Sequence, residues 1–177
     1  TIPSGIFHTD KLNVIGNGVV IDPITFEKEI ESISKHGVDL HKTLYISKKA
    51  HLILPTHRLL DAASEDAKGL TKIGSTLKGI GPTYRDKIGR DGLRVGDLTE
   101  NFTEKYTSKV QAHKDLLENY YHYDYAEKLA ALELEWMRGI EILKSFKIVD
   151  TEHLINESLA ESKSVLAEGA QGTMLDI

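Results

Sequence analysis

The chain has 177 residues, 40% of them hydrophobic, so it is long enough to bury one core and short enough to form a single domain. The formal net charge is -5 and the basic residues are spread along the sequence, which argues against a nucleic-acid-binding surface. There is no cysteine, no apolar run long enough to span a bilayer and no signal segment at the start. These properties exclude a disulfide-stabilised fold and favour a cytoplasmic protein that binds neither nucleic acid nor membrane.

Strand and helix signals alternate in the N-terminal part. The β-branched run Val14–Ile21 is interrupted by Gly16–Gly18, which predicts two short strands around a turn or one strand with a bulge. A helix follows, because Asp22 can cap it, Pro23 suits its first position and Gly37 suits the left-handed residue beyond its end. The order strand then helix indicates an α/β arrangement.

Two further strands and a second helix are predicted next. Thr43–Ser47 and His51–Leu54 are short and apolar enough for strands, and Thr56 is expected to cap a helix that ends before Gly69. This alternation is typical of a mostly parallel sheet covered by helices.

The remainder divides into a loop, a helical region and a returning strand. Thr71–Asp97 holds six glycines and no sustained hydrophobic period, which predicts a long functional loop. Ser164–Ala167 predicts a strand. Between them, hydrophobic spacings of three and four predict three helices, the last capped by Asp150 or Thr151: Phe102–Leu117, Tyr125–Leu143 and Leu154–Leu159.

The predicted fold is therefore α/β, with a mostly parallel sheet, flanking helices and a helical insertion. The expected bounds are residues 1–97 for the α/β part and its loop, 98–163 for the insertion, and 164–177 for the returning strand and the turn after it.

The first candidate site is the glycine-rich segment Gly74–Pro82. Its glycines free backbone N–H groups to face an anion, its hydroxyls can donate hydrogen bonds, and Lys78 adds a positive charge. The segment lacks the Gly-Lys-Ser/Thr ending of a P-loop, and neither it nor Gly16–Gly18 completes a dinucleotide-binding pattern. A phosphate-binding loop and a flexible connector are both open interpretations.

The second candidate is a group of basic residues directly downstream. Arginine suits bidentate recognition of phosphate, and both segments could face one anion. The alternative is a solvated loop in which these cations pair with Asp86, Asp91 and Asp97. The cations are Arg85, Lys87, Arg90 and Arg94.

The third candidate is Glu168–Thr173, at the expected carboxyl end of the returning strand, where open α/β sheets bind ligands. Gln171 offers an amide that can read a heterocycle or a sugar, and Gly169 and Gly172 allow close approach. A turn without a ligand is the alternative.

Other residue groups give weaker signals. The eight histidines show no helical ligand spacing beside a third ligand, so we expect no metal site and mostly surface or strand-end histidines. Four tyrosines around His122 are expected to pack against the face of Trp136. No nucleophile with its base is evident, and no catalytic residue is assigned.

Four segments, in this order, resemble the adenylosuccinate synthetase family. The similarity runs from Ile2–Gly5 to Leu175–Ile177, and across 99–163 it follows position and pattern more than identity. The segments are Val-Ile-Gly-Asn-Gly-Val-Val at 14–20, Ile-Gly-Ser-Thr-Leu-Lys-Gly-Ile-Gly-Pro-Thr-Tyr at 73–84, Gly-Leu-Arg-Val-Gly-Asp-Leu at 92–98 and Glu-Gly-Ala-Gln-Gly-Thr at 168–173.

The resemblance implies a ligase of AMP biosynthesis. In that family GTP phosphorylates the 6-oxygen of IMP, L-aspartate displaces the phosphate, and adenylosuccinate, GDP and phosphate result with the help of Mg²⁺. By resemblance, Thr76 and Gln171 contact IMP, and Arg90 crosses a homodimer interface to the 5′-phosphate of IMP in the partner subunit.

Other parts of the family pattern are missing from this sequence. The loop Gly-Asp-Glu-Gly-Lys-Gly-Lys with the catalytic aspartate, and the segment Asn-Ala-Gly-His-Thr with the catalytic histidine, are expected before Thr1. Later threonine, arginine, aspartate-loop and guanine-reading segments are expected after Ile177. We therefore expect a central segment that contributes IMP-binding residues, lacks the main GTP and Mg²⁺ ligands and is inactive when isolated.

Two other classes of function remain open. One is a non-catalytic module for nucleotide-phosphate binding or dimerisation that uses the same scaffold. The other is an ATP-utilising ligase of a different family, which the glycine-rich loop alone would suggest.

Overall fold

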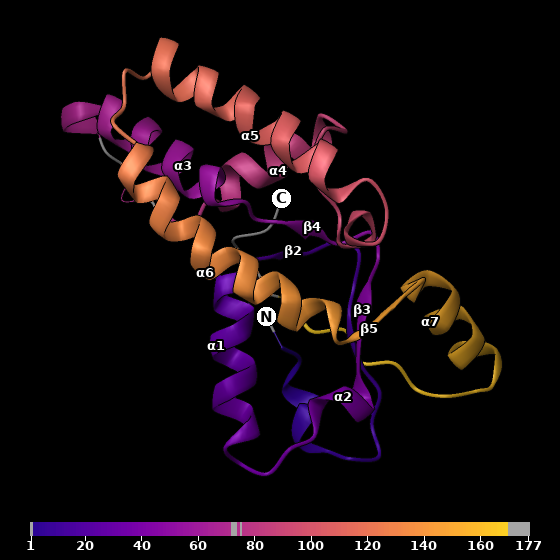
Figure 1. Cartoon of the computed structure of the whole chain (residues 1–177). Helices are drawn as coiled ribbons and strands as arrows, with labels where there is room; N and C mark the ends of the chain where they lie inside the picture. The colour runs from indigo at the N-terminus through magenta and orange to yellow at the C-terminus, as the bar shows by residue number, and fades with distance from the viewer. Residues whose placement is uncertain (1, 72–73, 75, 170–177) are drawn as a thin grey trace.

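The computed structural model describes residues 2–71, 74 and 76–169 (Figure 1). Their elements follow one another in this order: η1 (Ser4–Phe7), β1 (Asn13–Ile15), β2 (Val20–Ile21), α1 (Pro23–Ser34), α2 (Leu40–Thr43), β3 (Leu44–Ser47), β4 (His51–Leu52), α3 (Pro55–Ala67), η2 (Gly69–Thr71), α4 (Ile80–Ile88), η3 (Val95–Leu98), α5 (Phe102–Asn119), α6 (Ala126–Lys144), β5 (Lys147–Val149) and α7 (Thr151–Ala160).

The five strands β1 to β5 of the described residues pair with one another in parallel, which confirms the predicted sheet type. β1, β3 and β5 form a three-stranded sheet in that order, with Val14 opposite Tyr45 and Ile46 opposite Ile148. β2 and β4 form a separate two-stranded sheet. The run 14–21 is thus two strands around a turn, and the two strands enter different sheets.

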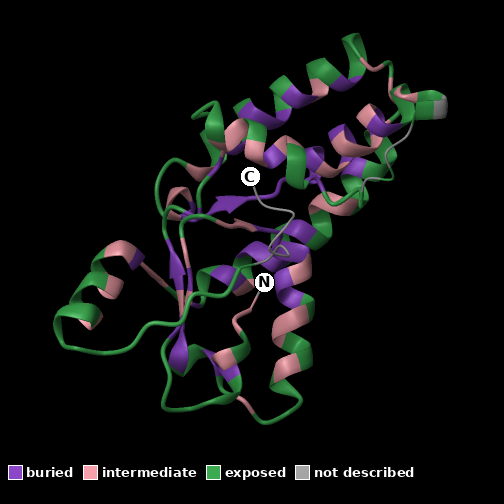
Figure 2. Ribbon diagram, turned by 180° about the vertical axis from the view of Figure 1, so that it is seen from behind, coloured by how far each residue is buried: buried purple, intermediate pink, exposed green. Residues whose placement is uncertain are grey.

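Helices cover the strands on both sides. α1 packs along α6, and α3 contacts α4, α5 and α6, while α7 contacts β3 on the other side of the strands from α1 (Figure 1). Buried residues concentrate in the strands and on the inward faces of the helices, whereas much of α7 is exposed (Figure 2). The arrangement confirms the α/β class with flanking helices.

The predicted start and end of α1 are confirmed. The Asp22 side chain accepts a hydrogen bond from the Ile24 N–H at 3.2 Å, Pro23 occupies the first turn, and Gly37 beyond the end has φ +76°. These are the cap and left-handed residue that the sequence indicates.

The start of α3 differs from the prediction, because Thr56 is not its cap. The helix begins at Pro55, and the Leu54 N–H donates instead to Nδ1 of His57 at 2.9 Å. Buried Thr56 hydrogen-bonds Nδ1 of His113 on α5 at 2.7 Å. A side chain from the first turn satisfies the free N–H, so the threonine hydroxyl serves a contact between helices.

The loop predicted over 71–97 is not continuous, because a helix interrupts it. α4 forms from Ile80 to Ile88, and its face at Gly79, Thr83 and Asp86 packs on α3. These contacts are made by a glycine, a threonine and an aspartate. The apolar residues Ile80 and Ile88 are exposed and do not form this contact face, so polar and backbone contacts stabilise the helix instead.

The core has two parts. The larger surrounds the strands and includes Trp136, whose Nε1 donates to the Ile53 carbonyl at 2.7 Å. The smaller lies between α3, α5 and α6 and is covered by Tyr121, Tyr123 and Tyr125. Packing is therefore confirmed for these three tyrosines, which cover the second cluster and not the face of Trp136, whereas Tyr120 is exposed.

The C-terminal part of the chain differs from the prediction at two strands. The sequence reading missed β5, a three-residue strand between α6 and α7 that is too short to show a period of two. The strand predicted over Ser164–Ala167 is absent, and Val165 and Leu166 are 50% and 91% exposed. This apolar stretch pairs with no strand of the described residues, and a strand requires a paired neighbour.

Candidate functional site

α4 connects the first two candidate segments. The glycine-rich segment leads into its N-terminus, and the basic residue Arg90 follows its C-terminus. The helix therefore lies between Thr76 and Arg90, and Arg85 and Lys87 of the second group lie on the helix itself.

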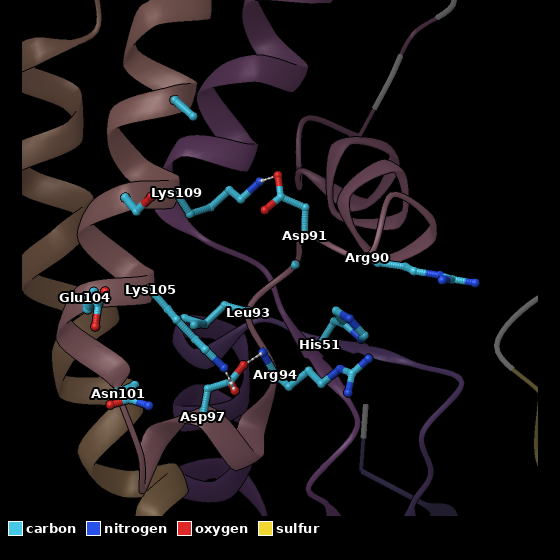
Figure 3. Close-up of a pocket in the computed structure, with 13 residues that line it drawn as sticks. His51, Arg90, Asp91, Leu93, Arg94, Asp97, Asn101, Glu104, Lys105 and Lys109 are labelled. Carbon is cyan, nitrogen blue, oxygen red and sulfur yellow. Dashed lines mark hydrogen bonds and ion pairs between the residues drawn. The ribbon is translucent and has the colours of Figure 1, made fainter.

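Arg90 follows α4 in an unusual backbone conformation. Its φ is +61°, in the left-handed region that favours glycine. The turn is closed by the Asp91 N–H, which donates to the Asp86 carbonyl at 2.9 Å. The side chain is exposed and points away from Lys109 (Figure 3).

Arg94 is placed by a backbone ladder along β4. The Leu52 N–H donates to the Leu93 carbonyl at 2.8 Å, and the Val95 N–H donates to the Ala50 carbonyl at 2.9 Å. This antiparallel pairing presents Arg94 beside His51, on the same side as Arg90 (Figure 3). A strand edge therefore orients the second arginine.

The three aspartates interleaved with these arginines are engaged with other groups. Asp86 accepts hydrogen bonds from His57 and His113, and Asp91 pairs with Lys109. Asp97 pairs with Lys105 at 2.5 Å and also accepts the Arg94 N–H at 2.7 Å.

These aspartates are paired with histidines and lysines and not with the neighbouring arginine side chains. Across the part of the chain that the structure describes, no ion pair neutralises the guanidinium of Arg90 or Arg94. Local pairing of the cations with the interleaved aspartates, the alternative considered from the sequence, is wrong for these two residues.

Lys87 has a different role from the arginines. Its Nζ donates to the carbonyls of Asn17 and Gly18 at 2.8 Å each, and the Tyr84 hydroxyl donates to the Gly18 carbonyl at 3.1 Å. Burial and then the charge of Arg94 lower the pKa of Lys87. This lysine fastens α4 to the loop between β1 and β2.

The arginines border a groove of about 650 Å³ (Figure 3). It contains both basic and acidic side chains, and the buried His51 is one of its lining residues. Burial, then Lys87 and Arg94, lower the pKa of His51, which favours its neutral form. The groove is lined by His51, Arg90, Asp91, Gly92, Leu93, Arg94, Asp97, Asn101, Glu104, Lys105, Ser108, Lys109 and Ala112.

At the other end of α4, Thr76 and Lys78 are exposed. Leu77 and Gly79 have φ values of +54° and +75°, and the Gly79 N–H donates to the Asp61 carboxylate at 2.9 Å. The segment is thus fixed where it joins the helix, and a hydroxyl and an ammonium group remain accessible to a ligand.

The third candidate is only partly described. Gln171 lies outside the described residues. Glu168 accepts hydrogen bonds from the Ser4 N–H at 3.1 Å and the Ser4 hydroxyl at 2.9 Å, and these bonds lower its pKa. The start of this segment therefore meets the N-terminal segment Ile2–Gly5.

Sequence reasoning missed the buried histidines. His51, His57 and His113 are buried, whereas the other five histidines are exposed, as expected for most of them. Ligand atoms of His57, Asp86 and His113 lie within 4.8 Å of one another. The three come from three helices, so no local spacing in the sequence could reveal them.

No helix in the described part of the chain is long and apolar enough to cross a membrane. This finding agrees with the hydropathy of the sequence.

Comparison with known proteins gives a consistent assignment. The sequence model of the adenylosuccinate synthetase family matches residues 1–177. Adenylosuccinate synthetases of Parabacteroides distasonis and Bacteroides thetaiotaomicron are 60% and 57% identical over 178 aligned positions, which cover 100% of this chain and 41% of each relative.

A solved structure agrees with the sequence comparison. The fully ligated adenylosuccinate synthetase from Plasmodium falciparum matches with a TM-score of 0.80 and 35% identity over 99% of this chain and 40% of that one. The chain therefore spans about two fifths of the length of the proteins it matches. On these grounds the chain belongs to the adenylosuccinate synthetase family.

Proposed function

We propose that this chain is the part of an adenylosuccinate synthetase that holds IMP while aspartate is joined to it at the expense of GTP. The observation that carries the proposal is the exposed, unpaired guanidinium of Arg90 at the end of α4, in a backbone conformation that arginine rarely adopts. An exposed guanidinium that no described carboxylate neutralises suits bidentate binding of a phosphate group.

The placement of Thr76 and Arg90 supports a site shared between subunits. α4 has nine residues and is about 13 Å long, and Thr76 and Arg90 lie beyond its opposite ends. This placement suits contacts with two different nucleotides. We infer that Thr76 serves the IMP of its own subunit, that Arg90 serves the IMP of the partner in a homodimer, and that Gln171 completes the nucleotide contact.

The roles of this chain would be binding and orientation. A guanidinium on the 5′-phosphate and a hydroxyl from the glycine-rich segment would fix the nucleotide so that its 6-oxygen meets the γ-phosphate of GTP. We assign no catalytic residue here, and we expect the isolated chain to lack activity. The acid, base and GTP contacts of the reaction would come from other parts of the enzyme.

Magnesium, which the family reaction uses, does not fit the described ligand cluster. Mg²⁺ prefers oxygen ligands in an octahedral arrangement, whereas His57, Asp86 and His113 offer two imidazole nitrogens and one carboxylate. We therefore place no Mg²⁺ ligand among the residues that the structure describes, and no step of the proposed function depends on one.

The test is a calorimetric titration of IMP into this chain at low salt, with sedimentation measured in parallel. Arg90→Gln should lose binding and should keep the dimer if the residue acts only on the phosphate. Gln171→Ala should lose affinity as well. Lys35→Gln, which removes an exposed positive charge that does not line the groove, should bind like the unmodified chain.

The outcomes separate the proposed function from its alternatives. Binding of IMP and not ATP, lost in Arg90→Gln, supports the IMP site and counts against an ATP-utilising ligase. Equal affinity in Arg90→Gln and Lys35→Gln would overturn the role of Arg90. Turnover after addition of GTP and aspartate would contradict the expectation that this chain alone is inactive, and would exclude a non-catalytic module.

A further inference from the structure

His57 on α3 contacts three successive positions along one face of α4. Its Nε2 lies 2.9 Å from the Asp86 carboxylate, and its Nδ1 lies 3.0 Å from the Thr83 hydroxyl. A Cβ on Gly79 would come within 2.7 Å of the His57 carbonyl carbon. α4 therefore rests directly on the backbone and the ring of one histidine.

The hydrogen bonds determine which nitrogen of His57 carries the proton. The Leu54 N–H donates to Nδ1 at 2.9 Å, so Nδ1 must be an unprotonated acceptor. The Thr83 hydroxyl donates to the Gly79 carbonyl at 2.7 Å and leaves Nδ1 to that backbone donor. In the neutral ring the proton is then on Nε2, where it is donated to Asp86.

His113 on α5 approaches the same carboxylate. Its Nε2 lies 3.1 Å from Asp86 Oδ2, and its Nδ1 lies 2.7 Å from the Thr56 hydroxyl. Lys109 Nζ is 3.5 Å from the same oxygen. Asp86 on α4 thus receives donors from α3 and from α5, and one carboxylate connects three helices.

The same protonation pattern argues against a metal ion at this cluster. Coordination through Nε2 of His57 would require its proton to move to Nδ1. Nδ1 already faces the N–H of Leu54, so two donors would oppose each other in a buried site. His57, Asp86 and His113 are therefore better described as a hydrogen-bonded contact between three helices, called the joint below, than as a metal site.

The joint is connected to the substrate segments through the backbone of α4. The Asp86 carbonyl accepts the Asp91 N–H and closes the turn that carries Arg90. At the other end of the helix, Gly79 joins the segment that contains Thr76. A rotation of α4 about its contact with His57 would displace both segments.

We propose that His57, acting through Asp86 and Gly79, is a positioning residue that sets the orientation of α4 and hence the placement of Arg90 and Thr76. The geometric part of this inference concerns the chain alone, whereas its consequence for IMP rests on the proposed function. The residue touches no substrate and acts through the helix that it holds.

Hydrogen exchange in the unmodified chain and its variants tests the geometric part. In Asp86→Asn, the amides of α4 and of the turn at Arg90 should exchange roughly tenfold faster or more, because a neutral amide replaces the charged carboxylate that both buried histidines share. Asp91→Asn removes another acidic partner of Lys109 without touching the histidines, and should change exchange by less than about twofold.

A second control separates positioning from general destabilisation. Leu117→Ala truncates a buried side chain in the smaller core cluster, outside the joint. When the two variants are compared at equal free energy of unfolding, the amides of α4 should exchange faster than the other amides in Asp86→Asn but not in Leu117→Ala. Equal exchange of α4 in Asp86→Asn and Leu117→Ala would overturn the proposal.

Two measurements on the unmodified chain keep the proposal testable if Asp86→Asn does not fold. Long-range ¹H–¹⁵N NMR spectra should show His57 protonated on Nε2, and a proton on Nδ1 would overturn the joint. Zn²⁺ should leave the unfolding temperature unchanged. Stabilisation by Zn²⁺ that is lost in His57→Gln would show a metal site instead.

The affinity for IMP tests whether the orientation of α4 affects substrate binding. IMP affinity should fall in Asp86→Asn and persist in Leu117→Ala. If the unmodified chain binds no IMP, the proposed function fails while the exchange and NMR results still decide the joint. If IMP affinity persists in Asp86→Asn although α4 opens, the positioning role is wrong.

Discussion

Gly92 lies against the imidazole ring of His51, and a Cβ at position 92 would come within 2.6 Å of the ring carbon Cδ2. His51 is buried, so its ring cannot move aside freely. We predict that Gly92→Ala lowers the free energy of unfolding by about 1–3 kcal/mol, the usual cost of overpacking. Urea unfolding followed by circular dichroism measures this change.

The clash at Gly92 can be tested by a double substitution. His51→Ala removes the ring, so Gly92→Ala should cost less in its presence. Gly16→Ala is a matched control, because a Cβ there meets nothing within 4 Å. Additive costs for positions 51 and 92 would contradict the assigned contact.

Trp136 provides a second stability prediction. Its indole Nε1 donates to the Ile53 carbonyl at 2.7 Å in the buried core. Trp136→Phe should lower the free energy of unfolding by about 1–3 kcal/mol, because the carbonyl loses its donor in a buried site. Leu134→Ala on the same helix, at a side chain that is 78% exposed, should change it by less than about 0.5 kcal/mol.

Regular elements with local signals could be predicted from the sequence. Asp22, Pro23 and Gly37 act within a few residues of α1, and each has the role that its chemistry indicates. α6 could be predicted equally well, because its apolar residues recur at spacings of three and four along a long helix. In such cases short-range chemistry determines the structure.

Features that depend on distant contacts could not be predicted in the same way. α4 has a contact face of glycine, threonine and aspartate whose partner His57 is more than 20 residues away. The cations near Arg90 were recognised, but their freedom from ion pairs depends on lysines of α5 that the sequence could not place. Long-range pairing therefore decided both the helix and the site.

Stability should depend on pH through His57. Burial lowers the pKa of His57 from 6.5 to about 4, although Asp86 acts in the opposite direction. Because the unfolded chain binds the proton more tightly, stability is present above pH 6.5 and is lost as the pH falls toward 4. The expected loss is about 2–3 kcal/mol.

Asp86 also makes stability fall with decreasing pH, but in a lower pH range than His57. Burial raises its pKa, but hydrogen bonds from His113 and His57 outweigh that effect and hold the pKa well below its usual range. Its contribution is therefore lost as the pH falls below about 4. Unfolding temperature measured across this range should fall less steeply in His57→Gln, and an unchanged slope would contradict the assignment.

Arg90 allows stability and binding to be separated. Its φ of +61° is strained for arginine and relaxed for glycine, so Arg90→Gly should raise the free energy of unfolding by about 0.5–1 kcal/mol. Arg94 has φ -100° in extended backbone, so Arg94→Gly relieves no strain and should lower stability. Thermal unfolding of both variants tests this contrast.

Arg90→Gly and Arg94→Gly also test why arginine is present at position 90 in a strained backbone conformation. If Arg90→Gly stabilises the fold and abolishes IMP binding, arginine is retained for its guanidinium at a cost in stability, as expected of a binding residue. If Arg90→Gly destabilises the fold, the side chain contributes to folding contacts, and the case for a phosphate ligand at the end of α4 loses its main support.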